Sequence, residues 1–347
     1  MNYRHAFHAG GFADVIKHIV LVRILTYLHE KPAAFRVIDT HAGAGLYDLT
    51  GDEARRSGEW LTGIARIMQA RFSEAAAPLL QPYLDVVRAF NERGDLKVYP
   101  GSPLFARALL RPQDRLTACE VEAKARTHLI DALRRDPQAR VVDLDGWTAL
   151  PAFVPPNERR GLVLVDPPFE AKDEFARLAD GFAKAFAKWP TGVYLLWYPA
   201  KSRRATDELA RHVAGIAASV KPAGKCLRLE FSVAPQLADA ALASTGLLIV
   251  NPPWTLQGEL KTILPELAKP LGQGAQAASG SRRRGPSSRP PSPQLSAAPH
   301  LGAGRVRRCG AATPSVPLKG FPREQIPFRL TTRGRAAAPI QPEWNRL

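Results

Sequence analysis

The chain has 347 residues, a hydrophobic content of 45% and a formal net charge of +16. This length and composition predict one large domain or two ordinary ones with a real core. No apolar run approaches the ~18 residues of a membrane span, and the first residues lack the apolar core of a signal peptide. The cysteines Cys119, Cys226 and Cys309 show neither metal-ligand spacing nor an even disulfide framework. We therefore expect a reduced, cytoplasmic protein without a membrane segment.

The positive charge is concentrated in the last part of the chain. Residues 271–347 contain 13 Lys and Arg against 2 Asp and Glu, a net +11, so the remaining residues hold 35 basic and 30 acidic side chains, a net +5. This Pro- and Arg-rich tail has no periodicity, and we expect it to be disordered. It is either a basic RNA-binding arm or a segment without selected function, such as a frameshift produces. We favour the second, because its basic residues do not form a compact block.

Residues 1–45 predict an arm, a helix and a first strand. The apolar spacing over 15–28 is that of a helix, and Asp14 lies in its first turn, where a carboxylate suits the helix dipole. The next apolar run ends in Asp39. The small residues after it include Gly43, which allows a ligand to approach the backbone closely. The glycines do not follow the G-x-G-x-x-G spacing, which argues against a nicotinamide cofactor.

Residues 46–98 predict an inserted helical subdomain, because helical runs over 56–68 and 78–91 interrupt the alternation of strands and helices. The alternation resumes over 99–270. There, Ser102 and the proline after it predict a helix start with Ser102 as N-cap. We expect the next strands over 115–120 and 140–145, ending in Glu120 and in Asp145, which Gly146 follows, and the residues from 147 to 160 as a connection.

The most informative stretch is 161–170. The aliphatic residues 162–165 predict a buried parallel strand, and Asp166-Pro167-Pro168-Phe169 follows it. The prolines stop the strand and fix the backbone at its carboxyl end, where open α/β sheets bind ligands.

A second tetrapeptide of this kind, Asn251-Pro-Pro-Trp254, follows the last predicted strand of the main region. It is far from the glycine loop in strand order, so we expect it to be structural. The other elements expected in this half are helices over 175–189, 207–220 and 255–269 and strands over 192–197, 226–233 and 245–250.

The series of strand-end acids, with a glycine loop first and Asp-Pro-Pro-Phe last, resembles the Rossmann-like methyltransferases that use S-adenosylmethionine. The resemblance implies an α/β fold of that class with an inserted small helical subdomain. It also implies that Glu120, after the second strand, binds the ribose hydroxyls of the cofactor and that Asp145 lies near its adenine. Asp or a similar residue, two prolines and an aromatic residue form the signature of amino-methyltransferases.

The chemistry of an exocyclic N6 amine suits this signature. Its lone pair is delocalised into the ring, so the amine is a poor nucleophile. The Asp166 carboxylate and the Pro167 carbonyl can hold its two N–H groups and localise the lone pair, and the acid or solvent can take the released proton. Rigid positioning supplies much of the catalysis, and Phe169 can stack on an extruded base for roughly 1–3 kcal/mol. No metal is required.

Several motifs together are similar to the RlmJ family, the 23S ribosomal RNA (adenine-2030-N6)-methyltransferases, over residues 1 to about 270. They are Tyr-Arg-His-x-Phe-His-Ala-Gly at 3–10, Ala-Asp-Val-x-Lys-His at 13–18, Asp-Thr-His-Ala-Gly-Ala-Gly at 39–45, Tyr-Pro-Gly-Ser-Pro at 99–103, Asp-Pro-Pro-Phe at 166–169, Leu-Trp-Tyr-Pro at 196–199 and Asn-Pro-Pro-Trp at 251–254. After Leu271 the chain departs from the family, because the expected short closing strand is missing and the basic tail replaces it.

The resemblance implies a site for S-adenosylmethionine and 23S ribosomal RNA as the partner, either protein-free or in an early assembly intermediate. It implies no membrane and no obligate protein partner. Asp166 is implied to be catalytic, and Tyr3, followed by Arg4, to reach the substrate adenosine. The implied cofactor site comprises Lys17, His18, His41, Ser102, Glu120, Asp145 and Gly146, to which the Gly43 loop and Asp166 are added.

Two alternatives remain open from the residues alone. A DNA adenine N6-methyltransferase shares the tetrapeptide and its chemistry. A non-catalytic RNA-binding protein could keep the fold.

Overall fold

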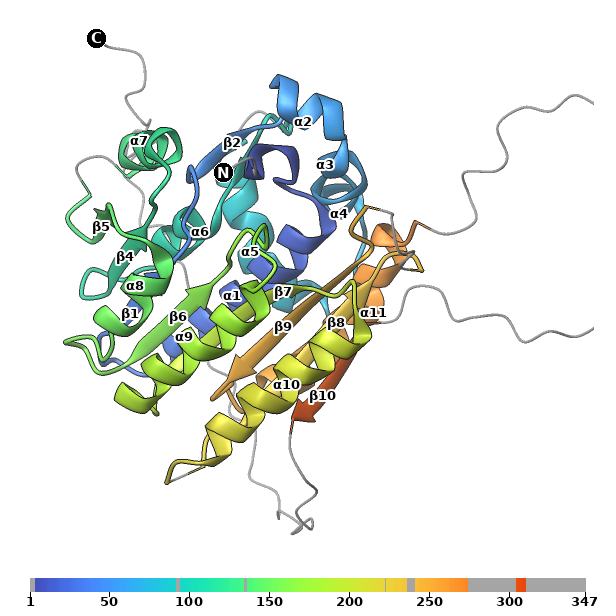
Figure 1. Cartoon of the computed structure of the whole chain (residues 1–347). Helices are drawn as coiled ribbons and strands as arrows, with labels where there is room; N and C mark the ends of the chain where they lie inside the picture. The colour runs from blue at the N-terminus through green and yellow to red at the C-terminus, as the bar shows by residue number, and fades with distance from the viewer. Residues whose placement is uncertain are drawn as a thin grey trace, which may run out of the picture. The chain divides into compact units, whose positions relative to one another are not determined.

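The computed structural model describes residues 4–91, 94–133, 136–221, 223–235, 241–273 and 304–309. They belong to one compact unit, built around an eight-stranded sheet in the order β10-β8-β9-β7-β6-β1-β4-β5 (Figure 1). Most of the tail predicted to be disordered lies outside the described residues. In this part of the chain, no helix is long and apolar enough to cross a membrane.

The sheet is parallel in one half and antiparallel in the other. The parallel strands are β1 (Arg36–Asp39), β4 (Arg115–Cys119), β5 (Ala139–Val142), β6 (Gly161–Val165) and β7 (Val193–Pro199). The strands β8 (Cys226–Ser232), β9 (Ser244–Val250) and β10 (Arg305–Cys309) continue the sheet, and β9 runs against both β7 and β8. The predicted α/β fold is confirmed.

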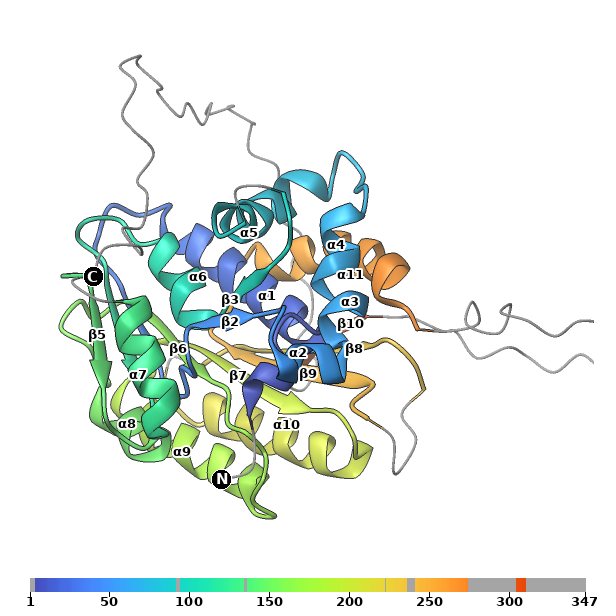
Figure 2. The same cartoon turned by 90° about the horizontal axis from the view of Figure 1, so that it is seen from above.

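Helices cover both faces of the sheet. One face carries α1 (Phe12–Leu28), α5 (Ala77–Ala89), α6 (Ser102–Ala108), α7 (Ala123–Ala132) and α11 (Leu256–Leu271), and the other carries α8 (Gly146–Ala152), α9 (Glu174–Lys188) and α10 (Arg203–Ala218) (Figure 2). The central strand β6 is buried from both sides, as its sequence predicts. Leu162 and Leu164 enter the core under α1, while Val163 and Val165 enter the core under α9.

The region predicted as one helical insertion begins and ends with short strands. β2 (Leu46–Asp48) and β3 (Val98–Pro100) pair antiparallel, and α2 (Asp52–Ser57), α3 (Glu59–Thr62) and α4 (Ile64–Gln69) precede α5. These three-residue strands, the 3-10 turn η1 (His5–Phe7) and α8 are too short to produce a periodic signal. The single helix predicted over 56–68 is wrong, because Gly58 adopts a left-handed conformation and Gly63 a non-helical one. The division of the unit into subdomains stays a prediction.

The expectation that the closing strand is missing is also wrong. β10 pairs antiparallel with β8 and forms the sheet edge. Val306 packs against the core under α11, whereas Arg305 and Arg307 are exposed. A five-residue strand with three arginines and one partly buried aliphatic residue has little hydrophobic alternation, which explains why its sequence resembles that of the tail. Charged side chains are a common protection for an exposed edge strand.

Asn251 and Asp166 lie at opposite ends of the strands of the sheet. β9 runs against the parallel strands, and its last residue, Val250, is level with Tyr194 near the start of β7. Asn251 has a left-handed backbone with φ 53°, and its amide donates to the carbonyls of Pro190 and Gly192, both at 2.8 Å. The side chain therefore closes a turn.

Replacing Asn251 by Ala should destabilise the fold by about 1–3 kcal/mol, because two partly buried carbonyls lose their donor. Urea unfolding of the variant and the wild type measures this difference. Trp254→Ala is the matched control, since the Trp254 side chain is 80% exposed and its loss should change stability by less than about 0.5 kcal/mol. Equal stability of Asn251→Ala and the wild type would contradict the structural role.

Candidate active site

β1 and β6 lie side by side at the point where the chain changes direction across the sheet. From β1 it continues outward to β4 and β5, and from β6 it continues to β7 on the other side. Loops that leave two such strands diverge and open a crevice at their carboxyl ends. Asp39 ends β1 level with Leu164, and Asp166 directly follows β6. Two carboxylates are thus brought to the switch point of the sheet.

A cavity of about 740 Å³ opens at this crevice, a size typical of ligand pockets. Loops that follow β1, β4, β5 and β6 contribute to its walls, together with the N-terminal arm and α1. Ten predicted site residues from separate stretches of the sequence line it: Arg4, Lys17, His18, His41, Gly43, Ser102, Glu120, Asp145, Gly146 and Asp166.

Lys17 is held between two carboxylates. Its ammonium lies 2.8 Å from Oδ1 of Asp14 and forms an ion pair with Oδ2 of Asp166. The side chains of Lys17 and Asp14 are 4% and 3% exposed, and that of Asp166 is 13% exposed. Burial lowers the pKa of Lys17, but the two carboxylates outweigh it and raise the pKa above its ordinary value. The residue therefore carries its charge.

Asp14 connects this ion pair to the N-terminal arm. Its Oδ2 accepts hydrogen bonds from the backbone N–H of Gly10 at 3.2 Å and from Nε2 of His5 at 2.9 Å. Burial raises the pKa of Asp14, yet His5 and Lys17 hold it well below its usual range. From the sequence, Asp14 was expected only to suit the helix dipole, and His5 was not among the predicted site residues. The three-residue spacing of Asp14 and Lys17 on one helix was the available signal.

Asp39 is buried beneath the cavity and bonded to Ser102. Ser102 Oγ donates to Oδ2 of Asp39 at 2.6 Å, so the prediction that Ser102 caps α6 is wrong; the N-cap is Gly101. The hydroxyl is committed to a buried carboxylate, which sits 63 residues earlier in the chain. Burial contributes most to raising the pKa of Asp39, and the nearby charge of Asp166 raises it further. The resulting pKa is about 7.

The glycine loop and Glu120 form a second polar wall. Glu120 accepts hydrogen bonds from the backbone N–H of Gly43 at 2.8 Å and of Glu122 at 2.7 Å, one on each carboxylate oxygen. Burial raises its pKa. Gly43 has φ 64°, and a Cβ there would lie 2.2 Å from Oη of Tyr47, so only glycine fits. Each oxygen of Glu120 keeps a lone pair for a ligand.

His41, Asp145 and Gly146 come together at the opposite wall. Asp145 caps α8 by accepting from the N–H of Thr148 at 3.0 Å. A Cβ on Gly146 would lie 2.5 Å from the His41 ring, so the close packing of these loops requires glycine. The His41 ring also meets Trp147 edge-on at 5.2 Å, and burial lowers the pKa of His41 to about 4.

His18 offers an unpaired nitrogen in the cavity wall. Its Nδ1 is hydrogen-bonded to Oη of Tyr99 at 2.8 Å, while its buried Nε2 finds no partner among the described residues. Burial lowers the pKa of His18 well below its ordinary value, so the ring is neutral. Because buried polar atoms are usually hydrogen-bonded, Nε2 of His18 is a candidate contact for a bound ligand.

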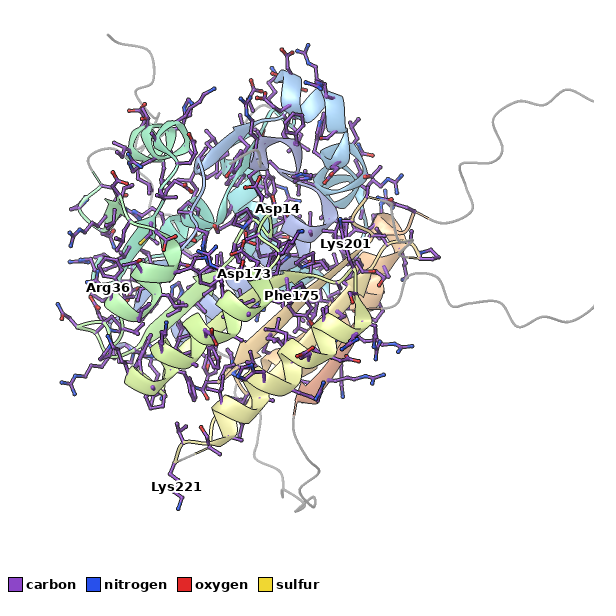
Figure 3. All side chains as sticks on the ribbon, viewed as in Figure 1. Asp14, Arg36, Asp173, Phe175, Lys201 and Lys221 are labelled. Carbon is purple, nitrogen blue, oxygen red and sulfur yellow. The ribbon has the colours of Figure 1, made fainter. Side chains whose placement is uncertain are left out.

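Two residues of the central motif do not line the cavity. Pro167 is buried behind it. Phe169 has φ 52°, an uncommon conformation for a bulky residue, and its ring packs edge-on against Phe175 at 4.9 Å and Trp197 at 5.6 Å. Figure 3 labels Phe175 and Asp14 at this end of the sheet.

Tyr3 lies outside the described residues, and Arg4 is exposed and paired with Glu53 at 3.3 Å.

Replacing Lys17 by Met should destabilise the fold by about 3–5 kcal/mol, because Asp14 and Asp166 lose the cation that balances their burial. Urea unfolding at neutral pH measures the change. Lys124→Met is the control, since Lys124 lines the same cavity but is exposed and should matter by less than about 0.5 kcal/mol. Similar effects of the two substitutions would contradict the buried ion pairs of Lys17 with Asp14 and Asp166.

Replacing Asp39 by Asn should change how stability depends on pH. The folded-state pKa of Asp39 is about 7, above its unfolded value of about 3.9, so the folded wild type holds a proton that the unfolded chain releases between these values. Its stability contribution is therefore lost as pH rises through this window. The variant should gain stability relative to the wild type between pH 5 and pH 8. Urea unfolding at both values tests this, with exposed Asp85→Asn as control; a difference independent of pH would contradict it.

Comparison with known proteins identifies the family. A family model described as "Ribosomal RNA large subunit methyltransferase D, RlmJ" matches residues 32–284. Proteins named ribosomal RNA large subunit methyltransferase J from Escherichia coli and Haemophilus influenzae are 40% and 37% identical, over 78% of this chain and 94% of their own length. A crystal structure of a Legionella pneumophila protein, 31% identical, matches with a TM-score of 0.72 over 86% of this chain and 98% of that one. The chain therefore belongs to the RlmJ family of ribosomal RNA large subunit methyltransferases.

Proposed function

We propose that this chain methylates the N6 amine of one adenine in 23S ribosomal RNA, of the adenine-2030 type. Its family methylates large-subunit ribosomal RNA with S-adenosylmethionine as methyl donor. The finer assignment rests above all on one observation: Asp166, the acid of the amino-methyltransferase signature, lines the cavity with one carboxylate oxygen held by Lys17.

The cavity suits S-adenosylmethionine. The Glu120 carboxylate keeps lone pairs for the two ribose hydroxyls, and the glycine positions Gly43 and Gly146 hold the loops close together. Nε2 of His18 is a buried nitrogen in need of a partner. Asp145 and His41 line the wall assigned to the adenine. When bound, this cofactor supplies a methyl group on a positively charged sulfur, which carboxylates nearby stabilise.

Asp166 and Pro167 hold the amine. Among the described residues no donor bonds to Oδ1 of Asp166 or to the carbonyl of Pro167, so both can accept the N–H groups of an adenine. This localises the nitrogen lone pair toward the methyl group. The N–C bond forms as the S–C bond breaks, and the released proton passes to the Asp166 carboxylate or to solvent. Lys17 fixes the other oxygen and so the orientation of the carboxylate.

Phe169 and the arm complete the RNA site in this proposal. Phe169 stacks on the extruded base by turning its ring away from Phe175 and Trp197, for which the strained backbone at φ 52° is poised. Tyr3 and Arg4 contact the substrate adenosine and its phosphates. We further propose that residues 46–98 act as an inserted subdomain, that the RNA is protein-free or in an early assembly intermediate, and that the protein works in the cytoplasm without an obligate protein partner.

Asp166→Ala should abolish methyl transfer while the fold is kept. We expect transfer from labelled S-adenosylmethionine to protein-free 23S ribosomal RNA to fall by about 100-fold or more, because the acceptor for the amine and its proton is lost. The matched control is Asn251→Ala, which alters the second tetrapeptide at the opposite end of the strands. At a temperature where this variant is folded, its transfer should stay within about threefold of the wild type.

The same assay discriminates between the alternatives. Transfer to duplex DNA rather than to RNA would favour a DNA adenine methyltransferase. RNA binding without transfer would favour a non-catalytic RNA-binding protein. Full activity in a folded Asp166→Ala variant would overturn the assignment of the motif.

A further inference from the structure

The edge strand β10 presents arginines on the face that carries α10. Its residues alternate, so Val306 faces the core under α11 while Arg305 and Arg307 are exposed on the other side. In the antiparallel register, Arg305 lies opposite Glu230 and Arg307 lies opposite Arg228. Two arginines directly across from each other repel, which a strand edge built only for stability would avoid.

Acidic neighbours do not balance this cluster. Arg228 is paired with Asp207 and Glu230, and Arg203 at the start of α10 is paired with Asp207 at 3.2 Å. In the part of the chain that the structure describes, Arg305 and Arg307 form no ion pair. Four guanidinium groups thus face two carboxylates. A small hollow of about 30 Å³ lies among Arg203, Arg228, Glu230, Arg305 and Arg307, with room for one water-sized group such as a phosphate oxygen.

This cluster lies at the same end of the strands as the active site. Glu230 is level with Gly246, which is level with Tyr198, two residues beyond the partner of Val165 in β7. Arg305, opposite Glu230, is therefore level along the strand direction with the carboxyl-terminal end of β7. Four strand spacings of about 4.8 Å separate β10 from β6, or about 19 Å. A stacked strand rising about 3.4 Å per nucleotide spans this in about five or six nucleotides.

Further basic groups lie between the two sites. Lys201 follows β7 and is exposed. Arg203 begins α10 two residues later. Figure 3 shows Lys201 and Lys221 at opposite ends of α10, with Lys201 at the end near the active site. A path of cations thus runs from the cavity rim along the start of α10 to β10.

We propose that β10 and the start of α10 form a phosphate-binding surface for the backbone of the RNA that flanks the target nucleotide. The proposal rests on the proposed function, because an RNA substrate in the cavity supplies the partner. Arginine forks bind phosphate oxygens in pairs, and the unbalanced charge of Arg305 and Arg307 becomes favourable only when an anion arrives. Residues of the basic tail would then take part in substrate binding.

The test uses the full chain with Arg305→Gln and Arg307→Gln combined, which removes two charges while keeping long polar side chains. Binding to protein-free 23S ribosomal RNA is measured by filter retention over a range of salt concentrations. We expect Kd to rise roughly 10- to 100-fold at 0.1 M salt, and the slope of log K against log salt to flatten by about 1.5–2. At saturating RNA, kcat should change by less than about twofold, because the chemistry is remote.

The matched control combines Lys221→Gln with Lys261→Gln, which removes the same charge from two exposed positions. Lys221 lies at the far end of α10 and Lys261 lies on α11, which covers the other face of the sheet, so the slope should be nearly unchanged. The pair Arg305→Lys and Arg307→Lys keeps the charge and should retain the slope. A glutamine pair that matches this control in Kd and slope would overturn the proposal.

A second measurement needs no variant. RNA should protect Arg305 and Arg307 of the wild type from modification by phenylglyoxal, read by mass spectrometry, and equal modification with and without RNA would also overturn the proposal. Both readouts are independent of methyl transfer. RNA protection without any transfer would reject the proposed function alone, and transfer without protection would reject the phosphate-binding surface alone.

Discussion

The buried ammonium of Lys17 is the constraint on which this site depends. Two carboxylates at one end of a sheet would repel each other and lose hydration on burial, and the cation between Asp14 and Asp166 offsets both costs. The same ion pairs connect three parts of the chain: the arm through His5, the helix α1, and the end of β6. Fold stability and the orientation of the Asp166 carboxylate therefore share one interaction.

The topology of the sheet decides which of two similar motifs reaches the cavity. Both tetrapeptides follow a buried strand. β6 is parallel to β1, so Asp166 follows it at the switch point of the sheet. β9 is antiparallel, so Asn251 lies at the opposite end of the strands, where it closes a turn. The glycine loop after β1 lies at the same end of the strands as Asp166, so both line one cavity.

The sequence predicted the structure correctly where a local pattern was enough to place an element in the fold. The uninterrupted aliphatic run of β6 and the strand-end acids predicted the sheet and the end of its strands where the cavity opens. Most of the ten predicted residues that line the cavity followed instead from the motifs shared with the family. The sequence was insufficient where a partner lies far along the chain. Nothing near Ser102 indicates that its hydroxyl bonds Asp39, 63 residues earlier, rather than the helix end. The strand β10 was missed because its pairing with β8, not its own composition, makes it a strand. The outward stacking of Phe169 was inferred from the signature, whereas its ring packs on Phe175 and Trp197.

In the proposed reaction, a carboxylate held by Lys17 presents an exocyclic amine to a methyl donor. The decisive experiment is nucleoside analysis of 23S ribosomal RNA after incubation with the wild-type protein and labelled S-adenosylmethionine. We expect a single labelled product, N6-methyladenosine, at one position of the RNA. A methyl group on a ribose oxygen, on a ring nitrogen or on another base would contradict it.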